Sequence, residues 1–171
     1  MHGIDTSLTF TALRIGVLTV SDRHSADTDS SGDLLARRVE DAGHTLVARA
    51  IVPGDVDAIR SILDEWIRRN AIDVIISNGG TGFSPRDVVP EAVRPLLTRE
   101  MDGFPVVFHT VSLASVGIST LQSRVLAGQI ERTFVFCLPG SSGACKDGWD
   151  GILAMELDSR YRPCSLVGHL G

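Results

Sequence analysis

The segment Asp73-Val-Ile-Ile-Ser-Asn-Gly-Gly-Thr-Gly82 joins a short apolar run directly to a glycine-rich turn. The run from Asp73 to Ser77 is too short for an amphipathic helix and is rich in β-branched residues, which is typical of a buried strand. Glycines directly after a strand let the backbone turn sharply and approach a ligand closely. The segment therefore predicts a buried strand whose carboxyl end leads into an anion-binding type of loop.

Two runs upstream have the same strand character. Arg14 to Val20 is short and β-branched, and His44 to Val52 alternates in part. Helical patterns separate the three runs, from Leu34 to Val39 in the first interval and from Val56 to near Asn70 in the second. This order predicts right-handed βαβ units, and hence an α/β fold with a mainly parallel sheet and helices on both faces.

Polar and glycine residues mark the expected ends of these helices. Ser30 or Ser31 is placed to cap the start of the first helix, and Gly43 suits a left-handed stop after its end. Pro53-Gly54-Asp55 makes a turn before the second helix. Each helix is thus expected to begin shortly after the carboxyl end of a strand.

The remainder of the chain continues as one domain. The expected elements are a proline-broken loop with a short helix near 85–95, an apolar helix over 104–116, strands over 123–130 and 133–138, and a closing helix over 144–157. Glu131-Arg132 fits a tight turn between the two strands. Since the 171 residues contain no linker or repeat, we expect a single domain over residues 13–171 after an N-terminal extension over 1–12.

Composition narrows the classes of partner. Hydrophobic residues make up 43% and charged residues 22%, as in ordinary globular proteins. A net charge of −5 and an aromatic content of 5% argue against nucleic acid, which needs a basic footprint or stacking platform. The three cysteines and five histidines lack the spacing of a disulfide framework or a zinc site. The first residues lack the pattern of a secretory signal, and the strand-like runs are shorter than a membrane span, so we expect a cytoplasmic location without a membrane partner.

Three polar, glycine-containing segments follow the predicted strands. They are Thr19 to Arg23, Asn78 to Gly82 and Leu138 to Ser142. Ligands of open α/β sheets bind outside the carboxyl ends of the strands. A tight strand-to-helix turn explains one such loop equally well, and neither a Walker A nor a GxGxxG motif is present. Three such loops at one edge favour a site for a small anionic ligand.

Asp87 and Arg86, just beyond the glycines, have two interpretations each. Asp87 is suited to a Mg²⁺ ion that bridges phosphates, or to capping a helix that has Pro90 at an early position. Arg86 is suited to pairing with a phosphate, or to a solvated turn. The local pattern does not decide between them.

Two hydroxyl-rich segments further along the chain also have more than one interpretation. Ser119 to Arg124 suits a polar ligand edge, a phosphate or a hydrogen-bonded turn. Ser141 and Ser142 open the final helix, where they either hold an anion at its positive end or only cap it. No Ser-His-Asp order or Cys-His pair is apparent, so covalent catalysis is not predicted.

Together the motifs resemble a known family. They are LTVSDR (Leu18 to Arg23), SNGGTGFSPRDVVPEA (Ser77 to Ala92), REMDGF (Arg99 to Phe104), STLQSR (Ser119 to Arg124) and LPGSSGAC (Leu138 to Cys145). In this order and spacing they resemble the MoaB/MogA family of molybdenum cofactor biosynthesis, from about Arg14 to the carboxyl end. The ending looks more like the MoaB branch than the longer MogA proteins.

The resemblance implies a three-layer αβα domain that assembles into homotrimers or homohexamers. In adenylyltransferase members, the terminal phosphate of molybdopterin attacks the α-phosphate of ATP with Mg²⁺ present, which gives adenylylated molybdopterin and pyrophosphate. The expected function is therefore molybdopterin adenylylation, with molybdopterin and ATP as substrates and Mg²⁺ as cofactor. One alternative is a MoaB-branch carrier or assembly protein that binds molybdopterin or a precursor without turnover, and another is a nucleotide-binding domain unrelated to molybdenum.

The resemblance also implies site residues. Phosphates would lie against Gly79, Gly80, Thr81 and Gly82, with Asp87 as the acidic residue associated with Mg²⁺ and adenylyl transfer. The other implied ligand-binding positions are Ser21, Asp22, Arg86, Ser119, Ser123, Arg124, Pro139, Gly140, Ser141 and Ser142.

One turn departs from the family pattern. Active members typically carry Pro-Asp after the second strand, and that aspartate is the second acidic group. Here the turn reads Pro53-Gly54-Asp55, so glycine holds the matching position. Asp55 either joins Asp87 as a catalytic and Mg²⁺-binding residue through a shifted loop, or only caps the following helix. The departure bears on catalysis and not on the fold.

Overall fold

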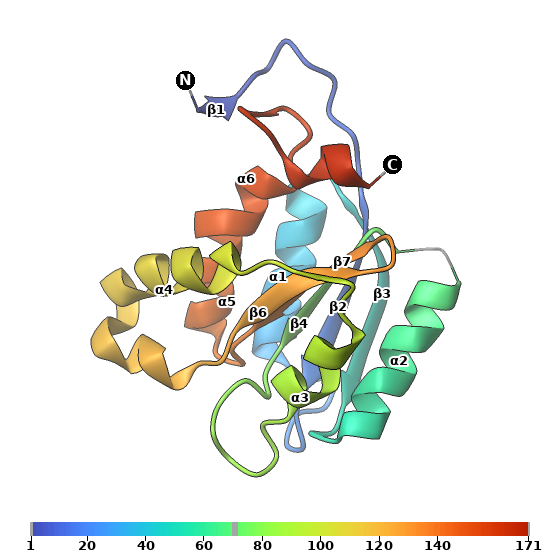
Figure 1. The fold of residues 1–171 in the computed structure, drawn as a ribbon, viewed down its shortest axis with the longest axis vertical. Coiled ribbons are helices and arrows are strands. Elements are labelled where there is room, and N and C mark those ends of the chain that lie inside the picture. The colour runs from blue at the N-terminus through green and yellow to red at the C-terminus, as the bar shows by residue number, and fades with distance from the viewer. Residues whose placement is uncertain (1, 70–71, 171) are drawn as a thin grey trace.

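The computed structural model describes residues 2–69 and 72–170. Within them a six-stranded sheet has the order β3-β2-β4-β7-β6-β5 (Figure 1). The strands are β2 (Arg14–Val20), β3 (Thr45–Val52), β4 (Val74–Asn78), β5 (Arg99–Glu100), β6 (Leu126–Ile130) and β7 (Thr133–Leu138). β3, β2, β4 and β7 are parallel, whereas β6 and β5 run antiparallel to their neighbours. The predicted mainly parallel sheet is confirmed.

Helices cover both faces of this sheet. The larger ones are α1 (Ser30–Asp41), α2 (Val56–Arg68), α3 (Val89–Val93), α4 (Gly103–Val116) and α5 (Ser142–Gly148). One hydrophobic cluster joins the sheet to α1, α4 and α5, and a second joins it to α2 and α3. Figure 1 shows α4 and α5 to one side of the strands and α2 to the other. The expected three-layer αβα architecture is therefore present.

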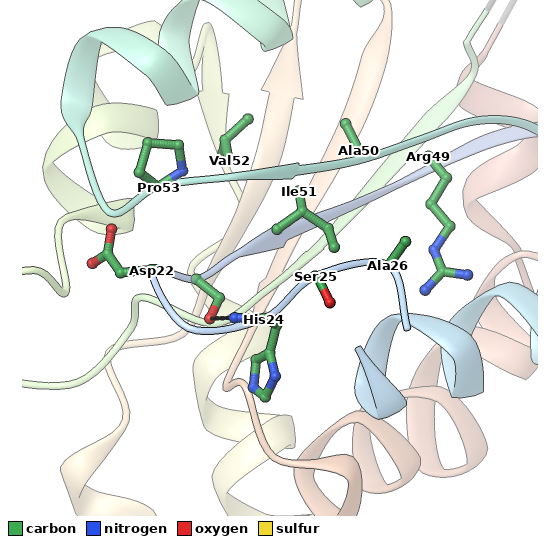
Figure 2. A pocket seen from close by; sticks show the side chains of 10 residues that line it. Asp22, His24, Ser25, Ala26, Arg49, Ala50, Ile51, Val52 and Pro53 are labelled. Carbon is green, nitrogen blue, oxygen red and sulfur yellow. Dashed lines mark hydrogen bonds between the residues drawn. The ribbon is translucent and has the colours of Figure 1, made fainter. Parts of the chain in front are cut away.

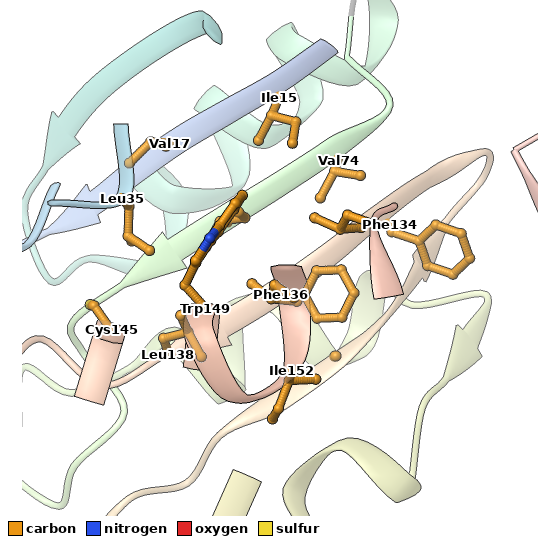
Figure 3. Close-up of a cluster of buried hydrophobic side chains, with 14 of the residues drawn as sticks. Ile15, Val17, Leu35, Val74, Phe134, Phe136, Leu138, Cys145, Trp149 and Ile152 are labelled. Carbon is orange, nitrogen blue, oxygen red and sulfur yellow. The ribbon is translucent and has the colours of Figure 1, made fainter. Parts of the chain in front are cut away.

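The alternation of side chains along β4 shows how the two clusters form. Val74 and Ile76 point into the cluster with α1 and α5, and Ile75 points into the cluster with α2. Figure 3 shows the first cluster, in which Trp149 lies among residues of the strands such as Val74 and Phe136. Each large apolar side chain buried in this way contributes about 1.5–3 kcal/mol. The central strands are thus fixed from both sides, and their ends are held in place.

Several element boundaries differ from those predicted. The N-cap of α1 is Asp29, whose side chain accepts from the Gly32 N–H, and not Ser30 or Ser31. β6 begins at Leu126, three residues after the predicted Ser123, because residues 117–122 still form a 3₁₀ helix, η2 (Gly117–Gln122). α2 ends at Arg68, and the predicted end near Asn70 lies outside the described residues. Gly43 has φ +85°, as the predicted left-handed stop requires.

The closing helix is interrupted. α5 passes into a π-helical segment, η3 (Trp149–Leu153), followed by α6 (Ala154–Glu156). Two glycines of this segment pack closely against neighbouring elements. A Cβ on Gly148 would be 2.7 Å from Leu138 Cδ2, and a Cβ on Gly151 would be 2.7 Å from Val111 Cγ1. The helix therefore fits tightly between the sheet and α4, in a place where apolar periodicity alone predicted a continuous helix.

The chain ends pair with each other. β1 (Gly3–Ile4) and β8 (Tyr161–Arg162) form a small antiparallel sheet, and the Thr11 N–H donates to Ser159 Oγ at 2.8 Å. Such two-residue strands have no periodic signal in the sequence. A 3₁₀ helix, η4 (Leu166–His169), follows, and η1 (Arg94–Leu96) extends α3.

α4 and η2 form one apolar helical segment over residues 103–122. By length and composition alone it is long and apolar enough to cross a membrane, and 22% of its most apolar stretch is buried. Phe104, Phe108 and Ser112 are the buried residues of α4, and both phenylalanines belong to the cluster with α5. The segment is thus the outer-layer helix of the domain, with an apolar face left exposed.

Candidate ligand-binding site

Three polar loops meet at the carboxyl edge of the sheet. The register places Thr19 of β2 beside Asn78 of β4, and Asn78 beside Leu138 of β7. The Gly79 N–H donates to the Leu138 carbonyl at 3.0 Å, and a Cβ on Gly140 would lie 3.0 Å from Gly79 Cα. The structure therefore brings together the loops that follow β2, β4 and β7.

The glycine loop after β4 requires its glycines. Gly79 and Gly80 have φ of +91° and +67°, which favour glycine. A Cβ on Gly79 would overlap the Val20 carbonyl, and one on Gly80 would lie 2.7 Å from Val89 Cγ2. Without side chains, backbone N–H groups of this loop can approach an anion directly.

Asp22 and Arg86 join two loops across the site. Arg86 Nε donates to Asp22 Oδ2 at 2.9 Å, and a terminal nitrogen of the same guanidinium donates to Oδ1 at 2.7 Å. The Gly54 N–H donates to the same Oδ1 at 3.2 Å. The bond from Arg86 lowers the pKa of Asp22 below its ordinary value. Arg86 is therefore a cation at the site edge whose partner here is a carboxylate.

The two acidic candidates have different local roles. Asp55 caps α2, because its Oδ1 accepts from the Ala58 N–H at 2.9 Å. Asp87 does not cap α3; its Oδ2 accepts from the Ser84 N–H at 2.9 Å and closes the turn before it. In 2–69 and 72–170, no three metal-binding side chains gather in one place. Mg²⁺ needs only one or two carboxylates when phosphates supply the other oxygens, and a loop carboxylate such as Asp87 has the chemistry for such an ion, whereas Asp55 is engaged as a cap.

Gly54 occupies the position that the family resemblance assigns to aspartate. It is buried, and a Cβ there would overlap the carbonyl oxygen of Arg86. The turn over 53–55 therefore touches the loop that carries Asp87, and this contact leaves no space for a side chain at Gly54.

Arg124 stabilises the loop between the glycines and α3. Its Nε donates to the Gly82 carbonyl at 2.9 Å, and a terminal nitrogen donates to the Asp87 carbonyl at 2.6 Å. It also pairs with Glu91, and its guanidinium lies 5.4 Å from the centre of the Phe83 ring. Arg124 thus reaches the site edge by bonding to the loop itself.

The remaining predicted residues differ in their placement. Because β6 starts beside the end of β7, Ser123, three residues before it, lies toward the same end of the sheet, whereas Ser119 is an exposed residue of η2. Ser141 Oγ caps α5 by accepting from the Ala144 N–H at 3.1 Å, and Ser142 Oγ lies 3.2 Å from Ser30 Oγ. The capping interpretation of Ser141 is therefore realised.

A pocket of about 640 Å³ lies between the loop after β2 and strand β3 (Figure 2). Its lining residues are Ser21, Asp22, His24, Ser25, Ala26, Arg49, Ala50, Ile51, Val52 and Pro53. Figure 2 shows Arg49 and Asp22 toward opposite ends of the pocket, with apolar β3 side chains between them. The volume is in the range of small-molecule sites. Ser21 and Asp22 were predicted, but His24, Ser25 and Arg49 were missed because nothing local marks them.

A group of buried polar residues lies below the loops, and one of its members, Asp29, was missed. Thr19, Asp29 and Asn78 are 1%, 0% and 1% exposed and are linked by hydrogen bonds. Burial raises the pKa of Asp29, but bonds from Thr19, Gly32 and Arg49 outweigh it and lower the pKa below the ordinary value. Thr19 and Asn78 stand in the quoted motifs, whereas Asp29 gave no signal apart from its position before a helix.

Comparisons with known proteins agree with this arrangement. Residues 16–159 match the family described as "Probable molybdopterin binding domain". The chain is similar to Molybdenum cofactor biosynthesis protein B of Escherichia coli, at 43% identity over 96% of both chains, and of Bacillus subtilis, at 38% identity over 85% and 86%. A crystal structure of a molybdenum cofactor biosynthesis protein B has 36% identity and a TM-score of 0.83 over 86% of this chain and 92% of that one. The tungsten cofactor synthesizing protein MoaB from Pyrococcus furiosus has 34% identity and a TM-score of 0.74 over 84% and 91%.

Proposed function

The chain belongs to the MoaB/MogA family of molybdenum cofactor biosynthesis proteins, and on that premise we propose that it adenylylates molybdopterin with ATP and Mg²⁺. The observation that carries this proposal is the contact of three polar loops at one sheet edge, where the left-handed Gly79 and Gly80 leave no side chain between the backbone and a ligand. Such an edge suits a ligand with several phosphates.

In the proposed reaction, a terminal phosphate oxygen of molybdopterin attacks the α-phosphorus of ATP. The new bond joins the pterin phosphate to AMP, and the bond to the β-phosphate breaks, which releases pyrophosphate. No protein nucleophile is required, so the chain acts by positioning the two phosphates and compensating their charge.

The proposed roles follow from the contacts. The loop over Gly79–Gly82 binds phosphate through backbone N–H groups, and Arg86 pairs with phosphate after leaving Asp22. Asp87 would hold Mg²⁺, with Asp55 as the second candidate carboxylate, and the ion would supply positive charge beside the phosphate oxygens. Arg124 keeps Asp87 in place through the backbone carbonyl of that residue.

The test is incubation of the purified chain with molybdopterin, ATP and Mg²⁺, with chromatography of adenylylated molybdopterin. Asp87→Asn keeps an acceptor for the Ser84 N–H but removes the charge, so we expect turnover to fall about 100-fold or more while the melting temperature changes little. Asp73→Asn, at the opposite edge of the sheet, is the control and should retain turnover. Unchanged turnover in Asp87→Asn would contradict the proposed role.

A second function, a carrier that binds molybdopterin without turnover, is favoured by Gly54. The second acidic position has no carboxylate, and Asp55 is engaged as a cap. Binding of molybdopterin without formation of product, at any Mg²⁺ concentration, would support the carrier and contradict the transferase.

We also propose that the chain forms homotrimers or homohexamers through the exposed face of α4 and η2. Val106, Leu113, Ile118 and Leu121 are 67%, 55%, 76% and 68% exposed, which is an unusual concentration of apolar surface. Light scattering should give a multiple of three chain masses. Ile118→Asp should dissociate the assembly, whereas Val47→Asp on edge strand β3 should not.

A further inference from the structure

A chain of buried hydrogen bonds connects the start of α1 to the end of β4. Thr19 Oγ1 donates to Asp29 Oδ2 at 2.7 Å, and Asn78 Nδ2 donates to Thr19 Oγ1 at 3.0 Å. On the other side of the amide, Ser31 Oγ donates to Asn78 Oδ1 at 3.0 Å. Residues far apart in the sequence are therefore joined beneath the glycine loop.

Each bond in this chain has a fixed direction. An ionised carboxylate only accepts, so the single hydroxyl proton of Thr19 is directed to Asp29. The Thr19 oxygen is then left as an acceptor, and the Asn78 amide must turn its NH₂ toward it. Ser31 completes the arrangement from the carbonyl side. The charge of Asp29 thus determines the orientation of a side chain two bonds away.

Asn78 is the residue directly before the glycine loop. Gly79 leaves β4 with φ +91° and donates its N–H to the Leu138 carbonyl at 3.0 Å. The Val20 carbonyl occupies the place that a Cβ on Gly79 would take, so the Gly79 backbone lies close to β2 on that side. A fixed Asn78 side chain therefore fixes where the loop over Gly79–Gly82 begins.

Arg49 compensates the buried charge. Its guanidinium lies 3.1 Å from Asp29 Oδ2 and 2.7 Å from Asp33 Oδ1. A carboxylate directly beneath an anion site would otherwise repel the ligand. With Arg49 at its side, the charge of Asp29 is offset in part, because the same guanidinium also pairs with Asp33.

We propose that Asp29, Thr19 and Asn78 are positioning residues for the phosphate-binding loop, acting in the order Asp29 to Thr19 to Asn78. The inference rests on the proposed function, because it assigns these residues to the same site. It does not require that the bound phosphate be transferred, so it holds for a transferase and for a carrier.

The test compares Thr19→Val with Thr19→Ser. Valine keeps the shape of the side chain but removes the hydrogen bonds of Thr19 with Asp29 and Asn78, whereas serine keeps the hydroxyl that makes them. The matched control is Thr133→Val at the opposite sheet edge, where a buried Thr133 Oγ1 donates to the Ile72 carbonyl at 3.1 Å. Both variants should fold, and Thr19→Val should lose more stability toward urea than Thr133→Val, because Thr19 bonds to a buried carboxylate and to an amide whereas Thr133 bonds to one backbone carbonyl.

Two measurements separate positioning from a purely structural role. The Kd for molybdopterin should rise about tenfold or more in Thr19→Val, and Thr19→Ser should recover most of the affinity. Thr133→Val should stay within about twofold of the parent chain. In the ligand-free chain, hydrogen exchange at the Gly79 amide should be faster in Thr19→Val than in Thr133→Val.

Parent-like affinity and Gly79 exchange in Thr19→Val, at reduced stability, would overturn the proposal. If the parent chain does not bind molybdopterin, the proposed function fails, and the exchange comparison still decides the positioning role. If Thr19→Val does not fold, Ser31→Ala removes the bond on the other side of Asn78 and should show the same two effects more weakly. Parent-like values in that variant would overturn the inference.

Discussion

The carboxyl edge and the amino edge of the central sheet differ in the backbone conformation and in the burial of charged groups at the strand ends. At the carboxyl edge, Gly79 is restricted to a left-handed φ and the carboxylate of Asp29 is fully buried. At the amino edge, Asp73 bonds to the Arg14 N–H at 2.7 Å and lies 3.5 Å from its half-exposed guanidinium. There, Gly43 is also left-handed, but so is the non-glycine residue Glu131, in an exposed hairpin turn. Strand ends that only reverse the chain tolerate a non-glycine residue and a solvated charge, whereas strand ends that form a binding surface depend on buried geometry.

The largest difference in the free energy of unfolding is expected between substitutions at two left-handed positions, Gly79 and Glu131. Gly79→Ala introduces a Cβ that overlaps the Val20 carbonyl, so we expect a loss of about 3 kcal/mol or more in the free energy of unfolding. Glu131→Gly should change it by no more than about 1 kcal/mol, since relief at φ +54° is offset by the entropy of glycine. Urea unfolding of both variants measures the comparison. Similar losses would show that the two edges are equally constrained.

A smaller difference is expected between the two aspartates. Asp29→Asn should lower the free energy of unfolding by about 2 kcal/mol, because the buried acceptor of three hydrogen bonds becomes neutral. Asp73→Asn should cost less than about 1 kcal/mol, because its ion pair is solvated.

The pH dependence gives a second measurement of the same pair. The pKa of Asp29 is lower in the folded chain than its ordinary 3.8, so the unfolded chain binds the proton more readily. The stabilisation is complete above pH about 4 and is lost as pH falls through the folded pKa. Acid unfolding of Asp29→Asn should therefore depend less on pH than that of the parent chain. An unchanged dependence would contradict the ionised state of Asp29.

The smallest changes in stability are expected within α2, which begins near the carboxyl edge of the sheet and ends near its amino edge. Asp55→Ala removes the cap of α2 at the carboxyl edge and should cost about 1 kcal/mol, which Asp55→Asn should largely restore. Asp64→Ala, near the amino edge, breaks an exposed pair with Arg68 and should cost about 0.5 kcal/mol or less. Thermal unfolding measures both. If Asp55→Asn retains stability but loses turnover, Asp55 acts in the reaction as well as in the cap.

The strand and helix order was predictable because both depend on local periodicity. β2, β3, β4 and β7 lie where their β-branched runs place them, and Gly43 ends α1 as expected. The two-residue β1, β5 and β8 were not predicted, since their pairing depends on segments distant in sequence.

The location of the candidate site followed from the same logic. The ends of adjacent parallel strands must share an edge, so the motifs after β2, β4 and β7 had to meet. The hydrogen-bond partners of the side chains could not be predicted from the sequence. Asp29 displaced Ser30 and Ser31 as the cap because its carboxylate also receives bonds from Thr19 and Arg49, ten and twenty residues away. Such partners become visible only when the chain is folded.

Gly54 also has an evolutionary meaning. Aspartate at this position requires that the carbonyl of Arg86 first move aside, so the effect of one substitution depends on residues that lie in another loop. Gly54→Asp alone would therefore be deleterious, whereas the same substitution combined with a rearranged 83–88 loop would be accommodated. Position 54 is thus epistatic with the 83–88 loop, because the residues of that loop determine which side chains position 54 accepts.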